Sequence, residues 1–182
     1  MLVLGEGEYT NGGGTLVLDK PTKIYGQGRG MTTLVGVGLE IQGNKRDGIV
    51  EIDNLTIKGA KGNGLDANNG MKVIMRGCSI EECQGSGVCA IRAEISCDDL
   101  QVVGCGQSGV CTCSDATITL SGQGTSIQGN ITSGRSCYYG LEAAQYTSHI
   151  RLVRPLTKDQ ISTNNGGGGN WGGKGTIEQV SK

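Results

Sequence analysis

The chain has 182 residues with a formal net charge of −1, and only 3% of its residues are aromatic. Because it shows neither a basic stripe nor an aromatic stacking platform, it is not expected to bind nucleic acid. No apolar run approaches the length that spans a membrane, and the apolar start, residues 1–4, is too short for a signal peptide, so we expect an intracellular protein without a membrane partner.

Residues 1–37 are expected to form the entrance coils of a repetitive fold. Short segments at 15–21, 23–30 and 32–36 are separated by glycine turns and indicate strands. The segment 26–30, Gly-Gln-Gly-Arg-Gly, superficially resembles a phosphate loop. Neither a Lys-Ser/Thr pair nor an amphipathic helix follows it, so the sequence does not favour nucleotide binding.

A repeat of the form Gly-Leu/Val-x-small organises the rest of the chain. It begins at Gly38, Gly64, Gly87, Gly109 and Gly140. The glycines are 23 residues apart from 64 to 87 and 22 residues apart from 87 to 109. A period in this range is typical of a solenoid, in which stacked units together bury a core that no single unit could bury.

Within each repeat, apolar residues alternate with polar ones and keep the same register from coil to coil, which indicates strands. The aligned inward positions are Val50, Val73 and Ile95, then Ile52, Met75 and Cys97, then Leu55, Cys78 and Leu100, then Ile57, Ile80 and Val102. A recurring bend is expected at Asn54, Gly77, Asp99 and Gly122, because these residue types tolerate a left-handed backbone.

The pattern predicts one all-β domain, a right-handed single-stranded parallel β-helix with three short strands in each coil of about 22–23 residues. Residues 1–37 form its entrance coils and residues 38–145 its regular coils. Residues 146–182 contain a C-terminal strand, a glycine-rich loop and a last strand.

Irregular features are expected after the central coils. A loop inserted at 122–126 would explain the long interval between the last two repeats. After a strand at 148–153, Pro155 ends the pattern and residues 156–161 can form a turn of helix. The glycine-rich segment 164–175 is expected to be a flexible loop that holds the single tryptophan, and residues 176–180 a last strand.

The eight cysteines follow the spacing of the solenoid and include no CxxC pair. Cys83 and Cys105 fall at equivalent inward positions together with Ala60, which predicts a ladder of thiols, whereas Cys89 and Cys111 share an outward position. A zinc site is therefore not expected. Free thiols that pack as small hydrophobes are favoured, and disulfides between stacked coils remain the alternative.

The chain resembles pectate-lyase-like right-handed β-helix proteins in its opening segments, Leu-Asp-Lys-Pro at 18–21, Tyr-Gly-Gln-Gly-Arg-Gly at 25–30 and Thr-Thr-Leu-Val-Gly at 32–36. The glycine repeats extend this resemblance to about residue 145. It is similar in particular to the small β-helix proteins of large algal (chlorella-type) viruses. That resemblance implies a virion-associated protein and a homotrimer.

Two functions follow from these observations. The first is a non-catalytic β-helix that binds an acidic or neutral polysaccharide or builds an assembly such as a virus particle. The second is a cation-dependent polyuronate lyase, in which calcium and a basic side chain labilise the proton beside a uronate carboxylate.

A candidate site lies on the sheet that carries the glycine repeat, because the resemblance places the ligand groove there. The outward residues of this sheet in successive coils are Glu40, Asp66, Cys89, Cys111 and Glu142. Glu40 and Asp66 are expected to stack and could share a calcium ion, with Asn68 as an auxiliary oxygen ligand. Arg92, level with Asn69, is the candidate catalytic base or ligand clamp. The alternative is that these side chains are solvated and that Arg92 pairs with Asp66.

Overall fold

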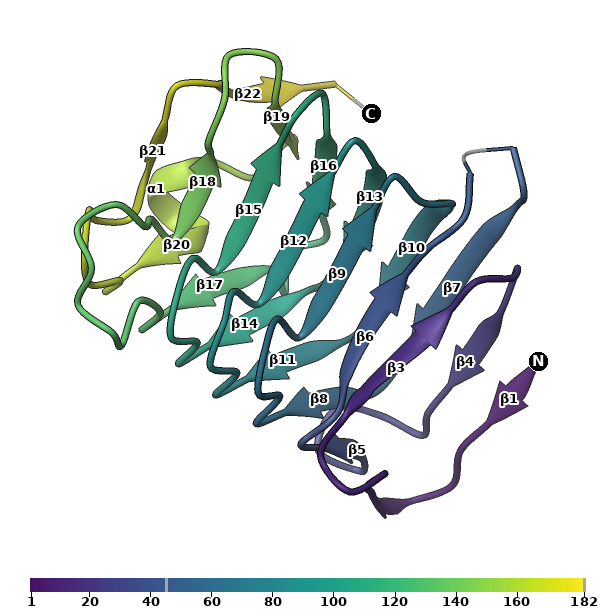
Figure 1. The fold of residues 1–182 in the computed structure, drawn as a ribbon. Coiled ribbons are helices and arrows are strands. Elements are labelled where there is room, and N and C mark those ends of the chain that lie inside the picture. The colour runs from purple at the N-terminus through teal and green to yellow at the C-terminus, as the bar shows by residue number, and fades with distance from the viewer. Residues whose placement is uncertain (45, 182) are drawn as a thin grey trace.

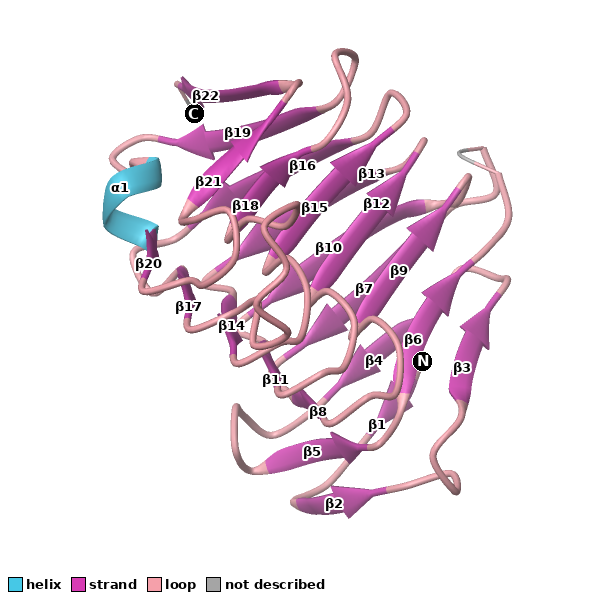
Figure 2. Ribbon diagram, turned by 60° about the vertical axis from the view of Figure 1, so that its left-hand side comes forward, coloured by secondary structure: helices cyan, strands magenta, loops and turns pink. Residues whose placement is uncertain are grey.

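The chain winds into a parallel β-helix with three strands in each coil (Figure 1), which confirms the predicted fold class. This computed structural model describes residues 1–44 and 46–181. Seven coils each give one strand to each of three sheets, the last strand adds to one sheet only, and the pairings between neighbouring coils are parallel. Figure 2 shows the three sheets enclosing a common interior.

The strands are named by their order in the chain, and the sheets are called A, B and C. Sheet A contains β1 (Leu2–Val3), β4 (Lys23–Tyr25), β7 (Ile49–Asp53), β10 (Lys72–Arg76), β13 (Glu94–Asp98), β16 (Thr117–Ser121), β19 (His149–Val153) and β22 (Thr176–Val180). Sheet B contains β2 (Gly7–Tyr9), β5 (Thr32–Val35), β8 (Thr56–Lys58), β11 (Ser79–Glu81), β14 (Gln101–Val103), β17 (Ser126–Gln128) and β20 (Ser162–Thr163). Sheet C contains β3 (Thr15–Leu18), β6 (Gly38–Ile41), β9 (Leu65–Asn68), β12 (Val88–Ile91), β15 (Val110–Cys113), β18 (Leu141–Ala143) and β21 (Trp171–Gly173).

The predicted register of the inward residues is confirmed. Val73 pairs with Val50 and Ile95, and Ile80 pairs with Ile57 and Val102. All the aligned inward residues named above are buried. The interior is therefore a set of apolar rows that run from coil to coil, one row for each inward position.

A left-handed residue joins sheet A to sheet B in each regular coil, as predicted. Asn54, Gly77, Asp99 and Gly122 have φ angles of 56°, 59°, 52° and 84°. The bend turns the chain sharply enough for the next residue to face inward, and Leu55, Cys78 and Leu100 are buried at that position. One left-handed residue per coil thus sets the angle between two sheets.

The repeat glycines are required because neighbouring coils approach closely where sheet C begins. A Cβ atom on Gly87 would overlap Cγ1 of Val102 and would lie 2.6 Å from the carbonyl oxygen of Gly109 in the next coil. The amide of Gly87 also donates a hydrogen bond to the carbonyl of Ser108, at 3.0 Å. Glycine at this position therefore lets a β-branched side chain fill the interior without pushing the coils apart.

The later part of the chain corrects two details of the sequence prediction. The tryptophan at 171 lies in strand β21, which pairs with β18, rather than in a flexible loop. Most of the inserted length lies between β17 and β18, at residues 129–140, compared with residues 104–109 in the preceding coil. The expected helical turn is α1 (Lys158–Ile161), and no helix in the described part of the chain is long and apolar enough to span a membrane.

The two ends of the β-helix differ. At the C-terminal end α1 packs against β17 and β20, while Trp171, in register with buried Leu141, is 41% exposed and has Lys158 over its ring, with Nζ 3.3 Å from the ring centroid. At the N-terminal end Leu16 lies in register with buried Leu39 but is 38% exposed, and Leu2 is 47% exposed. Residues 1–44 contain no helix that could cover these side chains. The first coil therefore leaves core positions open to solvent.

Replacing Gly87 with alanine is expected to destabilise the protein by about 3 kcal/mol, because the new methyl group would overpack the contact between two coils. Gly62→Ala is the matched control, since a Cβ atom there meets nothing within 4 Å. Chemical denaturation of both variants measures the difference. An equal, small change in both would contradict the close-approach explanation.

Self-association remains a prediction, and the open N-terminal end gives it a physical reason. Light scattering at micromolar concentration is expected to give a mass above that of the monomer, with a trimer as the predicted state. Leu16→Glu should shift the mass towards the monomer, whereas Val103→Glu, on the outer face of sheet B, should not. A stable wild-type monomer would refute the prediction.

Candidate functional site

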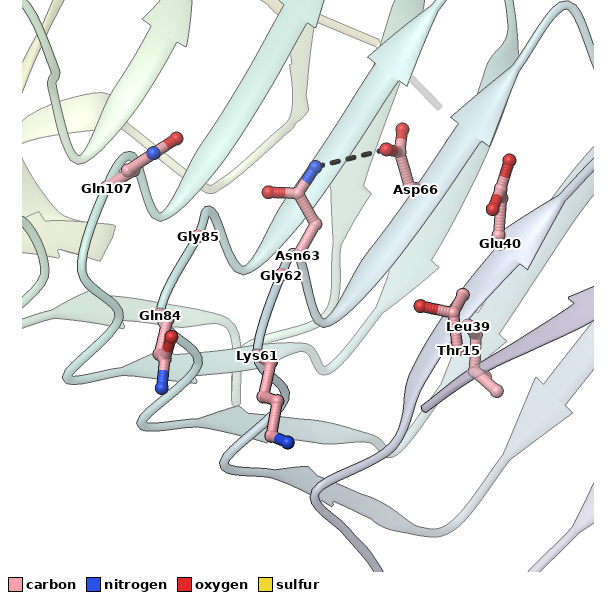
Figure 3. Close-up of a pocket in the computed structure, with 10 residues that line it drawn as sticks. All are labelled: Thr15, Leu39, Glu40, Lys61, Gly62, Asn63, Asp66, Gln84, Gly85 and Gln107. Atoms are coloured by element: carbon pink, nitrogen blue, oxygen red, sulfur yellow. Dashed lines mark hydrogen bonds between the residues drawn. The ribbon is translucent and has the colours of Figure 1, made fainter. Parts of the chain in front are cut away.

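A polar groove of about 440 Å³ lies over the outer face of sheet C, at the end where its strands begin. Figure 3 shows how strands β6 and β9 and the turns that precede β9, β12 and β15 form its walls. Its lining residues are Thr15, Leu39, Glu40, Lys61, Gly62, Asn63, Asp66, Gln84, Gly85 and Gln107. The groove thus crosses several coils and is lined mainly by carboxylate, amide and hydroxyl groups.

Glu40 and Asp66 lie directly opposite each other on strands β6 and β9, as predicted. The row continues in register through Cys89, Cys111 and Glu142. Glu40 Oε1 accepts a hydrogen bond of 2.8 Å from Gln42 Nε2. Two carboxylates therefore stand on neighbouring strands in the groove, about 4.8 Å apart at the backbone.

Asp66 is the most constrained carboxylate of the groove. Its Oδ2 accepts a hydrogen bond of 3.2 Å from Asn63 Nδ2, as Figure 3 shows, whereas its Oδ1 is buried and has no hydrogen-bond partner. Burial raises the pKa of Asp66 above its usual value, the negative charge of Glu40 raises it further, and the Asn63 hydrogen bond opposes both. Asp66 therefore carries a buried acceptor that no protein group satisfies, which adds to the cost of ionising this carboxyl.

The turns before sheet C are held by hydrogen bonds from coil to coil. Asn63 Oδ1 accepts from the backbone amide of Ser86 at 2.8 Å, and the amide of Gln107 donates to the carbonyl of Gly85 at 3.0 Å. A Cβ atom on Gly85 would lie only 2.5 Å from Asn63 Oδ1. This wall of the groove is therefore closely packed backbone, from which Gln84 and Gln107 project.

The other predicted site residues lie at the opposite end of the strands of sheet C, where β9 and β12 end. Arg92 Nη1 donates a hydrogen bond of 2.9 Å to Asn69 Oδ1, and Asn69 Nδ2 donates one of 3.1 Å to Asn68 Oδ1. Asn69 and Arg92 both have left-handed φ angles, of 53° and 50°. Asn68, Asn69 and Arg92 thus form a group of their own at the exposed turn, and the structure does not bring Arg92 to either Asp66 or Glu40 in the groove.

The structure offers two oxygen ligands, Glu40 and Asp66, for the predicted calcium ion. Calcium takes six to eight oxygen ligands, so other oxygens would have to complete such a site. Among the described residues no group of three or more His, Cys, Asp and Glu side chains is arranged to hold a metal ion. Calcium binding therefore remains a prediction.

Sequence reasoning missed the turn residues of the groove. Asn63, Ser86 and Ser108 each stand immediately before a repeat glycine, so they occupy one register position. That polar row was a usable signal: Asn63 bonds both Asp66 and Ser86, and the Ser108 hydroxyl donates a short hydrogen bond to Glu142. Gln84 and Gln107 gave no comparable signal, because only the fold brings their turns beside the carboxylates.

Comparisons of the chain with protein-family models, with curated proteins and with solved structures found no match. The resemblance to pectate-lyase-like and viral β-helix proteins thus remains a prediction based on the residues quoted for it.

Asp66→Asn is expected to stabilise the protein at neutral pH. A raised carboxyl pKa means that the folded state penalises the ionised form, so the penalty is present above the folded pKa and is relieved as the pH falls through that value towards 3.8. Melting temperatures of the wild type and the variant should therefore converge at acidic pH. Glu6→Gln, at an exposed position, is the control, and a gap that widens on acidification would contradict the assignment.

Proposed function

We propose that the protein is a non-catalytic β-helix that binds a neutral glycan in the groove on sheet C. The observation that carries the proposal is an open polar groove across several coils, lined by the carboxylates of Glu40 and Asp66 and by amide side chains of the turns. Sugar hydroxyl groups both donate and accept hydrogen bonds, so they match a surface of carboxylates and amides. An extended chain of sugars would lie across the coils and contact equivalent positions in each.

The charge of the groove favours a neutral glycan over an acidic one. Glu40 and Asp66 face the groove, whereas the Lys61 side chain extends away from both of them (Figure 3), and no ion pair is recorded between Lys61 and either carboxylate. A uronate would meet like charge unless a cation lay between. Small apolar molecules are also disfavoured, since their sites are concave and mostly apolar.

The lyase hypothesis is the second candidate, and the geometry gives it less support. Its chemistry requires a cation and a base close to the same sugar. The carboxylates that could hold a cation lie in the groove, where the strands of sheet C begin. Arg92 lies where the strands end and donates a hydrogen bond to Asn69. The proposed role in an assembly such as a virus particle would use the open N-terminal end instead and is compatible with glycan binding.

Titration calorimetry with soluble neutral glucans and mannans tests the proposal. We expect binding by the wild type and a loss of at least tenfold in affinity for Gly62→Trp, because this glycine lines the groove and its backbone leaves room for a Cβ atom, which would meet nothing within 4 Å. Val103→Trp adds the same side chain on the exposed face of sheet B and should bind normally. Equal binding by both variants would place the ligand elsewhere, and no binding by the wild type would refute the proposal.

The same titrations with polyuronates, with and without calcium, separate the two candidates. The lyase hypothesis predicts calcium-dependent ultraviolet absorbance from an unsaturated product, which glycan binding alone does not produce. Calcium alone should give heat with the wild type and none with Asp66→Asn if the carboxylates hold the ion. Negligible heat with both proteins would leave the cation site and the lyase hypothesis without support.

A further inference from the structure

Two thiols stand side by side on the outer face of sheet C, on strand β15. Cys111 and Cys113 are two residues apart on this strand, so their side chains point to the same face, and their Sγ atoms are 3.8 Å apart. Both are free thiols. Neither belongs to the apolar core, which includes four other cysteines. The packing of the core therefore does not account for this pair.

The strand geometry keeps the two sulfurs from bonding directly but leaves room for an ion between them. Residues two apart on an extended strand hold their Cβ atoms about 6.6 Å apart, whereas a disulfide needs about 3.5–4.5 Å. Thiolates bind a metal ion at about 2.3 Å, so one ion can join sulfurs that are up to about 4.6 Å apart. At the observed 3.8 Å, an ion about 2.3 Å from each sulfur would make a sulfur–metal–sulfur angle of about 110°. The two thiols are thus spaced as ligands of a single ion.

The pair can be reached from solvent and has a carboxylate beside it. Cys113 is half-buried, whereas Cys111 is 8% exposed, so an ion that arrives from solvent would meet Cys113 first. Glu142 lies in register with Cys111 on the neighbouring strand β18. Its negative charge attracts a cation at the pair.

The ligands favour a soft ion that needs few of them. Among the described residues no group of three or more His, Cys, Asp and Glu side chains is arranged to hold a metal ion, so the two thiols have no third protein ligand of these types in place. Zinc in structural sites is almost always four-coordinate, and calcium takes oxygen ligands. Soft thiolate ligands select Cu(I), which two thiolates can hold without further ligands.

We propose that Cys111 and Cys113 bind one Cu(I) ion as two thiolates on the outer face of sheet C. The thiols lose their protons to solvent when the ion binds, so the affinity falls as the pH falls. The copper stays Cu(I) throughout, and no sulfur is oxidised. Neither cysteine lines the groove, so copper binding does not depend on the proposed glycan site.

Anaerobic titration of the full chain with Cu(I), in competition with the chelator bicinchoninate, tests the proposal. Every variant carries Cys137→Ser, because that exposed thiol could bind copper on its own. We expect one copper per chain, and a loss of at least tenfold in affinity for Cys111→Ser and for Cys113→Ser. Cys89→Ser is the matched control, since Cys89 lies in register with Cys111 on strand β12, and it should bind copper as the Cys137→Ser protein does.

Three outcomes of this titration would overturn the assignment. The first is copper binding that survives Cys111→Ser or Cys113→Ser, and the second is binding that is lost in Cys89→Ser. The third is a Cys137→Ser protein that takes no copper from the chelator.

X-ray absorption spectroscopy of the copper-loaded Cys137→Ser protein covers the case in which a further serine variant does not fold. The copper should be surrounded by two sulfur atoms at about 2.3 Å. Zn(II) should not displace it, because two thiolates do not complete the four-ligand shell of zinc. Nitrogen or oxygen ligands, more than two sulfurs, or displacement by zinc would refute the two-thiolate copper site.

Discussion

The structure depends on how closely successive coils can approach at the start of sheet C. Gly64, Gly87 and Gly109 each lie against a side chain of sheet B and against the carbonyl of the next repeat glycine, so there is no room for a Cβ atom. Glycine there allows the coils to keep the spacing of hydrogen-bonded parallel strands, and this spacing places equivalent residues directly above one another. The apolar rows of the interior and the polar rows of the outer face are both consequences of it.

The same registration explains why much of the fold could be predicted from the sequence. Residues 22 or 23 positions apart occupy the same environment in successive coils, so what they share indicates that environment. Asn54, Gly77 and Asp99 share a tolerance of the left-handed backbone, which all three adopt. Prediction was poorer where the period is interrupted. The insertion at 129–140 and the strand that contains Trp171 each occur once, so no second copy could reveal their register.

The candidate site was predicted in part for the same reason. Glu40 and Asp66 were placed correctly because they share a register position on neighbouring coils. Whether Arg92 could reach them depended on which end of the strand it followed and which way a long side chain turned, and the alignment of coils determines neither. Arg92 instead donates a hydrogen bond to Asn69, which occupies the equivalent left-handed turn of the neighbouring coil.

The unequal ends of the β-helix give the molecule a direction of unfolding. Each coil is stabilised mainly by its neighbours, and at the C-terminal end α1 also packs against β17 and β20. Both terminal coils have a neighbour on one side only, but residues 1–44 contain no helix that packs on the N-terminal coil, so we expect fraying to begin there and to proceed towards the centre. Thr15 and Glu40, on the first two strands of sheet C, belong to these outermost coils, while Gln107 belongs to the interior. A ligand long enough to contact the outermost coils and Gln107 together would link the coils that fray first to the stable ones. Such a ligand would stabilise the solenoid along its axis.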